Sequence, residues 1–495
     1  MSHSIAHTPG NRLRVILGGL LLCTRFAAAQ DAPPPRPVVL TEGKDLLVVP
    51  NGAPALERSE GKDPLAARGL KLAIPSTGDV QLDSLIAEAL ARSPVTSAAS
   101  DRIAAARARI RPAGTRADPS LTAGLIQIPV RKPSLTDDNF TMLMAGITQN
   151  FPWPGKLALR TRAADLDAAA AGITLELARL GVVRAVKDAY FELAYLTEAL
   201  AIATRNQAVL VGVVRVTETL YSTGTASQQD VLKARVETAR LAETASMLEE
   251  ARRAALAQLN AARDRESDTP VSTPRIPERI ARAAIAADIA TVRFSAQTLG
   301  ARVADSPFPA LAVLQAAAIR SSPMLREHEA RIAVQAARVE VARKDYRPDF
   351  DVSLQYNHRV AYPDLVTAQV SIPLRLQKSA KQDQAVAEAV AELSALEGEH
   401  RADVNTVRAR VATLLGDLER DRTQLALYVK AILPQSRGGV TSALASYQSG
   451  RGSLLSLLDL QNTVFTYETA YYRSLSDFAK SLAELELVTG TQVLP

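Results

Sequence analysis

The sequence predicts a mainly α-helical protein that also carries β-strands of the kind found in membrane β-barrels, arranged as two copies of one unit. Three observations predict this fold class. Apolar residues make up 47% of the 495 residues but aromatic residues only 4%, and Ala, Leu and charged residues dominate, as is typical of long helices. Sequence landmarks recur at a nearly constant spacing. Segments that alternate apolar and polar residues lie between the predicted helices.

The N-terminal segment 1–29 has the pattern of a secretory signal peptide. Two arginines precede an apolar run at 15–22, and alanines at 27–29 supply the small residues that cleavage needs. The only cysteine, Cys23, lies inside this segment. Lipid attachment at Cys23 is the alternative to simple cleavage, although the preceding Leu22 favours cleavage because a small residue is usual there. After cleavage the chain would have no thiol and no disulfide.

The rest of the chain mixes positive and negative charges. No basic tract predicts nucleic acid binding. No run of about 20 apolar residues follows the signal peptide, so no transmembrane helix is predicted. An exported protein without such a helix is either soluble or a membrane β-barrel.

One unit is duplicated along the chain. Four landmarks of the first half recur in the second half in the same order, at offsets between 221 and 229 residues. The pairs are Pro94 and Pro323, Pro119 and Pro348, Pro152 and Pro373, and Gly224 and Gly450. A nearly constant offset of this kind predicts an internal structural repeat.

Composition shifts set the predicted boundaries. Prolines, glycines and charges predict an extended N-terminal arm, and a second proline-rich stretch joins the two copies. The predicted segments are a signal peptide at 1–29, the arm at 30–75, a first helix–hairpin–helix repeat at 76–265, a linker at 266–308, a second repeat at 309–490 and a C-terminal tail at 491–495.

Long helices dominate each copy. Shorter helices at 82–112 and 310–345 lead into a Pro-marked break. No proline lies between Pro154 and Pro270, so a helix at 155–221 would be ~100 Å long. A turn with Gly224 ends it, because glycine tolerates left-handed geometry, and the chain returns at 228–263. The second copy repeats this plan at 377–449 with a turn at 450–452, and Pro434 is expected to kink its helix.

Four predicted strands carry the membrane signal. In the segments 350–358 and 365–374 apolar and polar residues alternate strictly, whereas 120–129 and 141–151 alternate less cleanly. Strands of about ten residues suit a tilted membrane crossing with lipid outside and a wet lumen inside. The alternative is a half-buried sheet in a soluble protein. Four strands cannot close a membrane barrel, so several chains, two, three or four, would share one.

These features together resemble the TolC-type outer-membrane efflux proteins over residues 80–490. The motifs at 149–156 (QNFPWPGK), 432–434 (ILP) and 457–461 (LLDLQ) resemble the branch that serves heavy-metal pumps of the resistance–nodulation–division (RND) type. The resemblance implies a homotrimer with a twelve-stranded barrel in the outer membrane and a twelve-helix periplasmic tunnel. It also implies that the inner end of the tunnel is closed at rest and meets a periplasmic adaptor protein, which joins it to an inner-membrane pump.

The resemblance places the closed end of the tunnel at the two helical turns. The matching residues are Tyr221, Gly224, Thr225 and Asp230 in the first copy and Tyr447, Gly450, Arg451, Ser456 and Asp459 in the second. Related proteins carry two aspartates three residues apart on the second tip helix, whereas this chain has Ser456 at the first of these positions. A ring of Asp459 carboxylates would favour cations. The alternative is that Asp459 is an ordinary acid stabilised by the helix dipole.

A lock between neighbouring chains is a further expectation for these turns. Asp230 follows its turn glycine by six residues, and Asp459 follows Gly450 by nine. Arg451 is placed to pair with Asp230 of the next chain, although the family's arginine lies one residue further on, where this chain has Gly452. Such a partly exposed pair would contribute about 0.2–1 kcal/mol.

The remaining candidate residue is the single tryptophan, Trp153, which directly follows a strand and stands between two prolines. It is expected either to anchor the barrel at the membrane interface or to pack at the junction between strand and helix.

Enzyme signatures are absent from the sequence, which has no Gly-rich phosphate loop, GxSxG, HExxH or CxxC motif. The three histidines of the mature chain are widely separated, so they predict no metal site, and no cofactor is predicted.

The sequence therefore predicts an outer-membrane channel, not an enzyme, that conducts substrate passively from a pump to the exterior. Its cargo would be metal cations or small toxic compounds. A periplasmic coiled-coil structural or adaptor protein is the alternative, because it would share the long helices. Such a protein would not need four amphipathic strands.

Overall fold

A computed structural model describes residues 79–131, 133–137, 139–272, 274–285, 292–295, 300–303, 306–490 and 492–494. All of these belong to one of the two units into which the chain divides, Asp63–Pro495. The predicted signal peptide with Cys23, and the arm at 30–75, lie outside the described residues.

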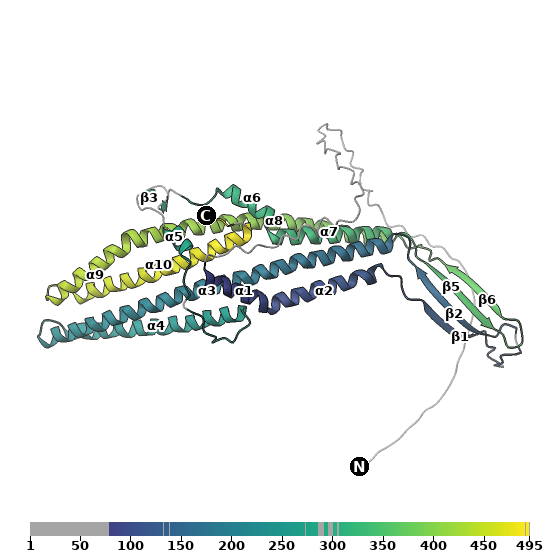
Figure 1. The fold of residues 1–495 in the computed structure, drawn as a ribbon, viewed down its shortest axis with the longest axis horizontal. Coiled ribbons are helices and arrows are strands. Elements are labelled where there is room, and N and C mark those ends of the chain that lie inside the picture. The colour runs from purple at the N-terminus through teal and green to yellow at the C-terminus, as the bar shows by residue number, and fades with distance from the viewer. Residues whose placement is uncertain are drawn as a thin grey trace, which may run out of the picture. The chain divides into compact units, whose positions relative to one another are not determined.

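The chain contains the same series of elements twice (Figure 1). The first series is α1 (Val80–Arg92), α2 (Pro94–Gly114), β1 (Ser120–Ile126), β2 (Met142–Phe151), α3 (Lys156–Ser222) and α4 (Gln228–Ala262). The second is α6 (Leu311–Ser321), α7 (Pro323–Lys344), β5 (Phe350–His358), β6 (Leu365–Ser371), α8 (Gln382–Leu427), the π-helical turn η3 (Tyr428–Ile432), α9 (Leu433–Gln448) and α10 (Leu454–Thr489). Between them lie α5 (Glu278–Ile285), β3 (Val292–Ser295) and β4 (Gly300–Val303).

Each of the shorter predicted helices is in fact two helices. The expectation of single helices at 82–112 and 310–345 is wrong, because the chain breaks at Ser93 and Ser322. Both serines precede a proline, which disfavours helical geometry in the residue before it; their ψ angles are 122° and 116°. Each proline then begins the next helix, where its missing N–H costs nothing.

A π-helical turn, η3, precedes Pro434, where the sequence predicts a kink. The proline has no N–H to donate to the carbonyl of Lys430, four residues earlier. The helix changes from α-helical to π-helical hydrogen bonding in η3, just before Pro434. Such single π-helical turns occur within α-helices.

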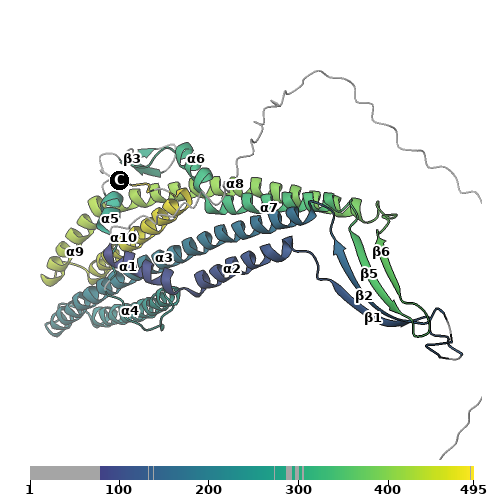
Figure 2. The same cartoon turned by 45° about the vertical axis from the view of Figure 1, so that its right-hand side comes forward.

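The four long strands form one antiparallel sheet in the order β1-β2-β5-β6 (Figure 2). The predicted strands at 120–129 and 365–374 end early, at Ile126 and Ser371. Gln127 takes a left-handed φ of 56°, and Pro129 and Pro373 cannot donate to a ladder.

The two faces of the sheet differ in polarity, as strict alternation requires. Register places the apolar residues of neighbouring strands side by side, for example Ile147 opposite Leu354. This face is exposed and includes Leu121, Leu125, Leu143, Ile147, Val352, Leu354, Tyr356, Val366 and Val370. The other face carries polar residues, of which Ser353 and Asn357 are buried.

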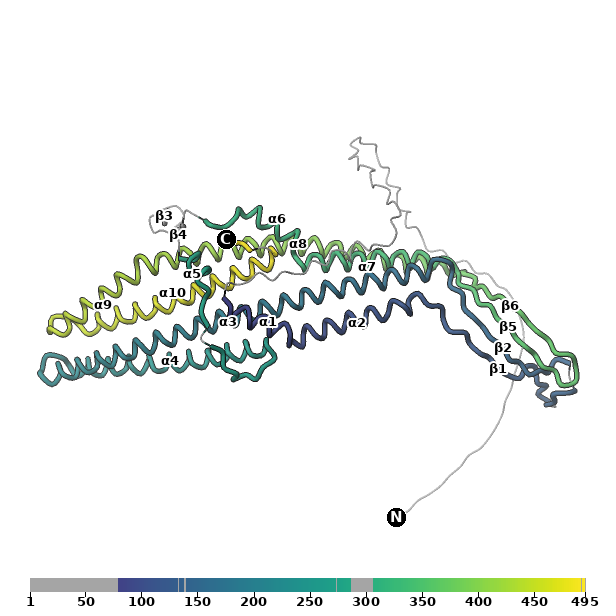
Figure 3. The backbone as a smooth tube through the Cα atoms, in the orientation of Figure 1, coloured from purple at the N-terminus to yellow at the C-terminus, as the bar shows by residue number. Residues whose placement is uncertain are grey.

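The helices run side by side away from the sheet (Figure 3). Near the sheet α3 lies between α2 and α7, and further along it pairs with α4 and contacts α10. The main apolar core gathers residues of α1, α3, α5, α8 and α10, with Tyr190, Phe191 and Phe478 fully buried. No described helix has a stretch that is long and apolar enough to cross a bilayer.

Candidate functional site

The two turns predicted as a gate lie at the end of the helices remote from the sheet (Figures 1 and 2). One joins α3 to α4 and the other joins α9 to α10. A small apolar cluster that includes Leu210, Val213, Leu454 and Leu457 packs the two helix pairs together behind them. The turns are therefore held in fixed relation within one chain.

The first turn is closed by backbone hydrogen bonds to the end of α3. Gly224 N–H donates to the carbonyl of Tyr221 at 3.0 Å, and the N–H groups of Thr225 and Ala226 donate to the carbonyl of Leu220. Gly224 has a φ of 77°, a left-handed conformation that residues with a Cβ rarely adopt. The Thr225 hydroxyl donates to the same Leu220 carbonyl at 2.9 Å.

The second turn repeats this geometry. Gly450 has a φ of 72° and donates to the carbonyl of Tyr447, while Arg451 and Gly452 donate to the carbonyl of Ser446. Each of these bonds matches one in the first turn at an offset of 226 residues. The two turns are thus one structural motif used twice.

The two tyrosines of the motif have different surroundings. Tyr447 is 5% exposed, and its hydroxyl donates to Thr217 Oγ1 on α3 at 3.1 Å. Burial raises the pKa of Tyr447. Tyr221, its counterpart in the first repeat, is 49% exposed. One tyrosine therefore links the two helix pairs, and the other faces outward from the single chain.

The acids of the two turns also differ. Asp230 forms a capping box at the start of α4, in which its carboxylate accepts from Ser227 N–H and Oγ at 3.1 and 2.8 Å. At the same offset of 226 residues the second repeat has Ser456, which is exposed. Asp459 is an exposed residue in the second turn of α10 and corresponds to Lys233 of the first repeat.

Arg451 is exposed, and its Nε lies 3.4 Å from Ser449 Oγ in its own turn. Within one chain the structure does not bring it to Asp230, whose carboxylate is engaged by Ser227.

The family model for outer membrane efflux proteins matches residues 85–263 and 313–491, one stretch in each repeat. The chain belongs to the outer membrane efflux protein family. Membership confirms the predicted location in the outer membrane and the prediction of an efflux protein, not an enzyme. A comparison with curated proteins finds no match.

Solved structures similar to this efflux protein include several outer-membrane proteins. The outer-membrane channel OprN is 19% identical with a TM-score of 0.68, and the match covers 85% of this chain and 92% of that chain. VceC of Vibrio cholerae is 19% identical with a TM-score of 0.65, over 85% and 99% of the two chains. CusC is 15% identical with a TM-score of 0.66, over 83% and 92%. These likenesses confirm the predicted two-repeat fold.

Two buried polar residues of this efflux protein were not predicted from the sequence. Asn206 on α3 and Gln461 on α10 are hydrogen-bonded to one another through their side chains within the interface between the helix pairs. Together with Thr217 they form polar links between the repeats. No local pattern identifies them, because each partner is more than two hundred residues away in the sequence.

Trp153 lies at the junction between β2 and α3 and is half-buried. Its backbone N–H donates to the carboxylate of Asp349 at 2.9 Å, and the Arg347 guanidinium lies 5.7 Å from the centre of its ring. Beside it Lys156, 1% exposed, forms ion pairs with Asp345 at 3.1 Å and Asp349 at 2.7 Å. These contacts tie the start of α3 to the connection between α7 and β5.

Among the residues that the structure describes, no group of three or more His, Cys, Asp or Glu side chains is placed to hold a metal ion. His328 and His358 each pair with one aspartate, at 2.8 and 2.9 Å.

Proposed function

We propose that this efflux protein is the exit duct of a tripartite efflux pump and acts as a homotrimer. Four strands from each chain would give a twelve-stranded barrel in outer-membrane lipid, continued by a periplasmic tunnel of α-helices. A periplasmic adaptor protein and an inner-membrane pump of the RND type would be its partners. The duct itself would conduct substrate passively.

The observation that carries this proposal is the sheet. Its strand order leaves β1 and β6 with one neighbour each, and unpaired edges are not tolerated in lipid. One face is apolar and exposed across all four strands, whereas the other carries most of the polar residues together with Ile126, Met142, Met144 and Leu365. A sheet of this kind is complete only when β6 of one chain pairs with β1 of another and the apolar face meets lipid.

The gate is proposed at the turns, with Tyr221, Gly224, Thr225 and Asp230 facing their second-repeat counterparts and a ring of Asp459 carboxylates at the constriction. The exposed position of Asp459 and of Arg451 supports this, since both side chains are available to a neighbouring chain. Trp153 is proposed as an interfacial anchor because it stands where β2 leaves the sheet.

The test is a measurement of pore formation by the purified full-length protein in planar bilayers, together with chemical cross-linking in detergent. The proposal expects a cross-linked dimer and a cross-linked trimer beside the monomer, with no larger species, and discrete ion conductance. A protein that stays monomeric without detergent and conducts no ions would overturn the proposal in favour of a periplasmic coiled-coil protein.

The cargo is proposed to be metal cations, with small toxic compounds as the second candidate. Support comes from the motifs at 149–156 and 457–461, which resemble the metal-efflux branch. Cells that lack the protein should become sensitive to copper, silver or zinc salts while keeping their resistance to organic dyes. Sensitivity to dyes alone would assign the protein to the second class of cargo.

A further inference from the structure

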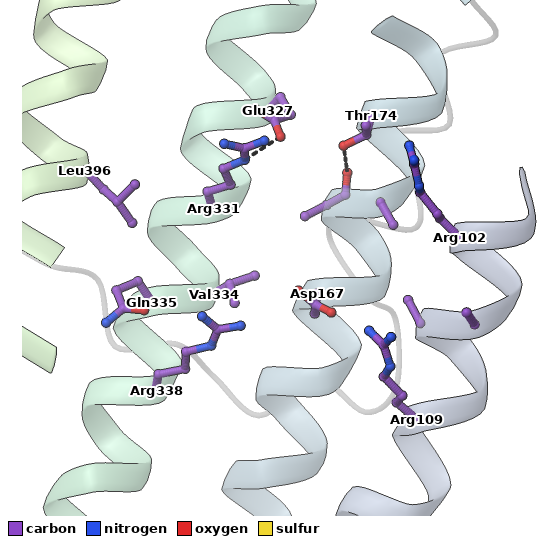
Figure 4. Close-up of a pocket in the computed structure, with 14 residues that line it drawn as sticks. Arg102, Arg109, Asp167, Thr174, Glu327, Arg331, Val334, Gln335, Arg338 and Leu396 are labelled. Atoms are coloured by element: carbon purple, nitrogen blue, oxygen red, sulfur yellow. Dashed lines mark hydrogen bonds and ion pairs between the residues drawn. The ribbon is translucent and has the colours of Figure 1, made fainter. Parts of the chain in front are cut away.

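A cleft of about 570 Å³ lies between α2, α3 and α7 (Figure 4). Four arginines line it, Arg102 and Arg109 from α2 and Arg331 and Arg338 from α7. Figure 4 shows the four side chains directed toward α3 from its two sides. We refer to this feature as the arginine cleft.

The four arginines are two copies of one pattern. Arg102 and Arg331, and likewise Arg109 and Arg338, are 229 residues apart, which is the offset of the repeat in this region. Both helices read Arg-Ile-Ala at the first position and Ala-Arg at the second. Residues seven apart lie on one face of a helix, about 10 Å apart along its axis. Two arginine pairs therefore face each other across α3.

Only one of the four arginines forms an ion pair within the described residues. Glu327 pairs with Arg331. No carboxylate forms an ion pair with the other three arginines anywhere in the described part of the chain. Asp167 of α3 also lines the cleft, so the lining has two more positive than negative charges. All four arginines are exposed to solvent, and their excess positive charge would attract an anion from outside the chain.

The shape of the cleft leaves room for that anion. Its floor is made of small side chains, namely Ala105 and Ala106 of α2 and Ala170 and Ala171 of α3. Thr174 adds a hydroxyl, which is bonded to the carbonyl of Ala170. Because all of these residues sit in regular helices, the guanidinium groups are held apart by the backbone and do not collapse on one another.

We propose that the arginine cleft binds an anion that carries at least two phosphate groups. A guanidinium offers two parallel N–H donors that match the oxygens of a phosphate. Two pairs of guanidiniums on opposite walls fit a ligand with separated phosphates better than a single small anion. Such phosphates are found in free polyphosphates and in phosphorylated lipid headgroups, and the site's chemistry is the same for both.

The first test is calorimetric titration of the trimer in detergent with sodium tripolyphosphate. We expect binding to the unaltered protein, and at least tenfold weaker binding to the double variant R102Q/R338Q, which removes one guanidinium from each wall. The matched control is R107Q, since Arg107 is an exposed residue of α2 that does not line the cleft. Equal affinity of R102Q/R338Q and R107Q, or no binding to the unaltered protein, would overturn the proposal.

The variant R102K/R338K controls for misfolding. It keeps both positive charges and removes only the bidentate hydrogen-bond donors of the guanidinium groups. The proposal expects its affinity to fall between those of the unaltered protein and R102Q/R338Q. An affinity equal to that of the unaltered protein would rule out phosphate recognition by the guanidinium. A second titration with diphosphorylated lipid A in the same detergent distinguishes the two sources of phosphate. Tighter binding of lipid A would assign the cleft to lipid headgroups, and tighter binding of tripolyphosphate would assign it to free polyphosphates.

Discussion

At the scale of single residues, the two repeats use the same amino acid for different purposes. Tyr447 links α9 to α3 through Thr217, which is 0% exposed, whereas the equivalent Tyr221 faces outward. The Tyr447 hydroxyl is buried, so its hydrogen bond to Thr217 offsets the cost of removing that hydroxyl from water.

The first prediction concerns this pair. Tyr447→Phe should weaken the link between the two helix pairs by about 0.5–1.5 kcal/mol per chain and raise single-channel conductance in planar bilayers. Tyr362→Phe is the control, because Tyr362 is an exposed tyrosine between β5 and β6, and it should leave conductance unchanged. An equal rise in both variants would show that the buried bond has no special role in keeping the turns together.

The second prediction concerns Asp421 of α8, which is 2% exposed. Burial raises its pKa from 3.8 to about 6, against the opposing effect of the Arg420 ion pair at 2.9 Å. The folded protein thus holds this proton more tightly than the unfolded chain does. Its contribution to stability is present below the unfolded pKa and is lost as pH rises to about 6.

Asp421→Asn removes this titration. The melting temperature of the variant relative to the unaltered protein should therefore rise between pH 4 and pH 6 and level off above pH 7. The whole change corresponds to at most about 3 kcal/mol. Melting curves in detergent across this range measure it, and a difference that does not vary with pH would show that the buried carboxyl keeps its ordinary pKa.

At the scale of elements, successive side chains of a strand point to opposite faces of the sheet, so neighbouring residues have different surroundings. Leu354 and Gln355 are neighbours in β5 but point to opposite faces of the sheet. Leu354 is 57% exposed on the apolar face, and Gln355 lies on the face that carries Ser353 and Asn357.

The third prediction is that cysteines at these two positions react differently. Leu354→Cys should be protected from a water-soluble maleimide in proteoliposomes, because lipid covers it. Gln355→Cys should react through the wet lumen. The chain's only native cysteine is Cys23, so Cys23→Ser provides the background. Equal labelling of both positions would contradict a membrane barrel.

Elements also show where local sequence rules sufficed. Gly224 and Gly450 permit the two predicted turns, because a left-handed backbone conformation depends only on the residue that adopts it. The same reasoning failed for the shorter helices, where an apolar pattern continued through a proline that ends one helix and begins the next.

At the scale of the whole molecule, one chain presents only part of any ring around a pore. An acid such as Asp459 acquires its effect when copies from several chains face one another, since rings of like charge repel ions of that sign.

The fourth prediction is that Asp459→Asn lowers the preference for cations, measured as the reversal potential across a bilayer with a KCl gradient. Block by divalent cations should weaken in the same variant. Glu243→Gln, at an exposed acid on α4, is the control and should change neither quantity. Unaltered selectivity in Asp459→Asn would mean that Asp459 is an ordinary acid near a helix N-terminus and that the constriction lies elsewhere.

The sequence by itself determined the features that depend on neighbouring residues or on the repeat. The long helices, the two glycine turns, the amphipathic strands and the duplication all follow from local periodicity and a constant offset. Only the tertiary structure decided which distant side chains meet. Tyr447 with Thr217, Gln461 with Asn206, buried Lys156 with Asp345 and Asp349, and the facing arginines of α2 and α7 all join segments far apart in the chain. Periodicity states which face of a helix a residue occupies, but the packing of one helix against another decides what that face contacts.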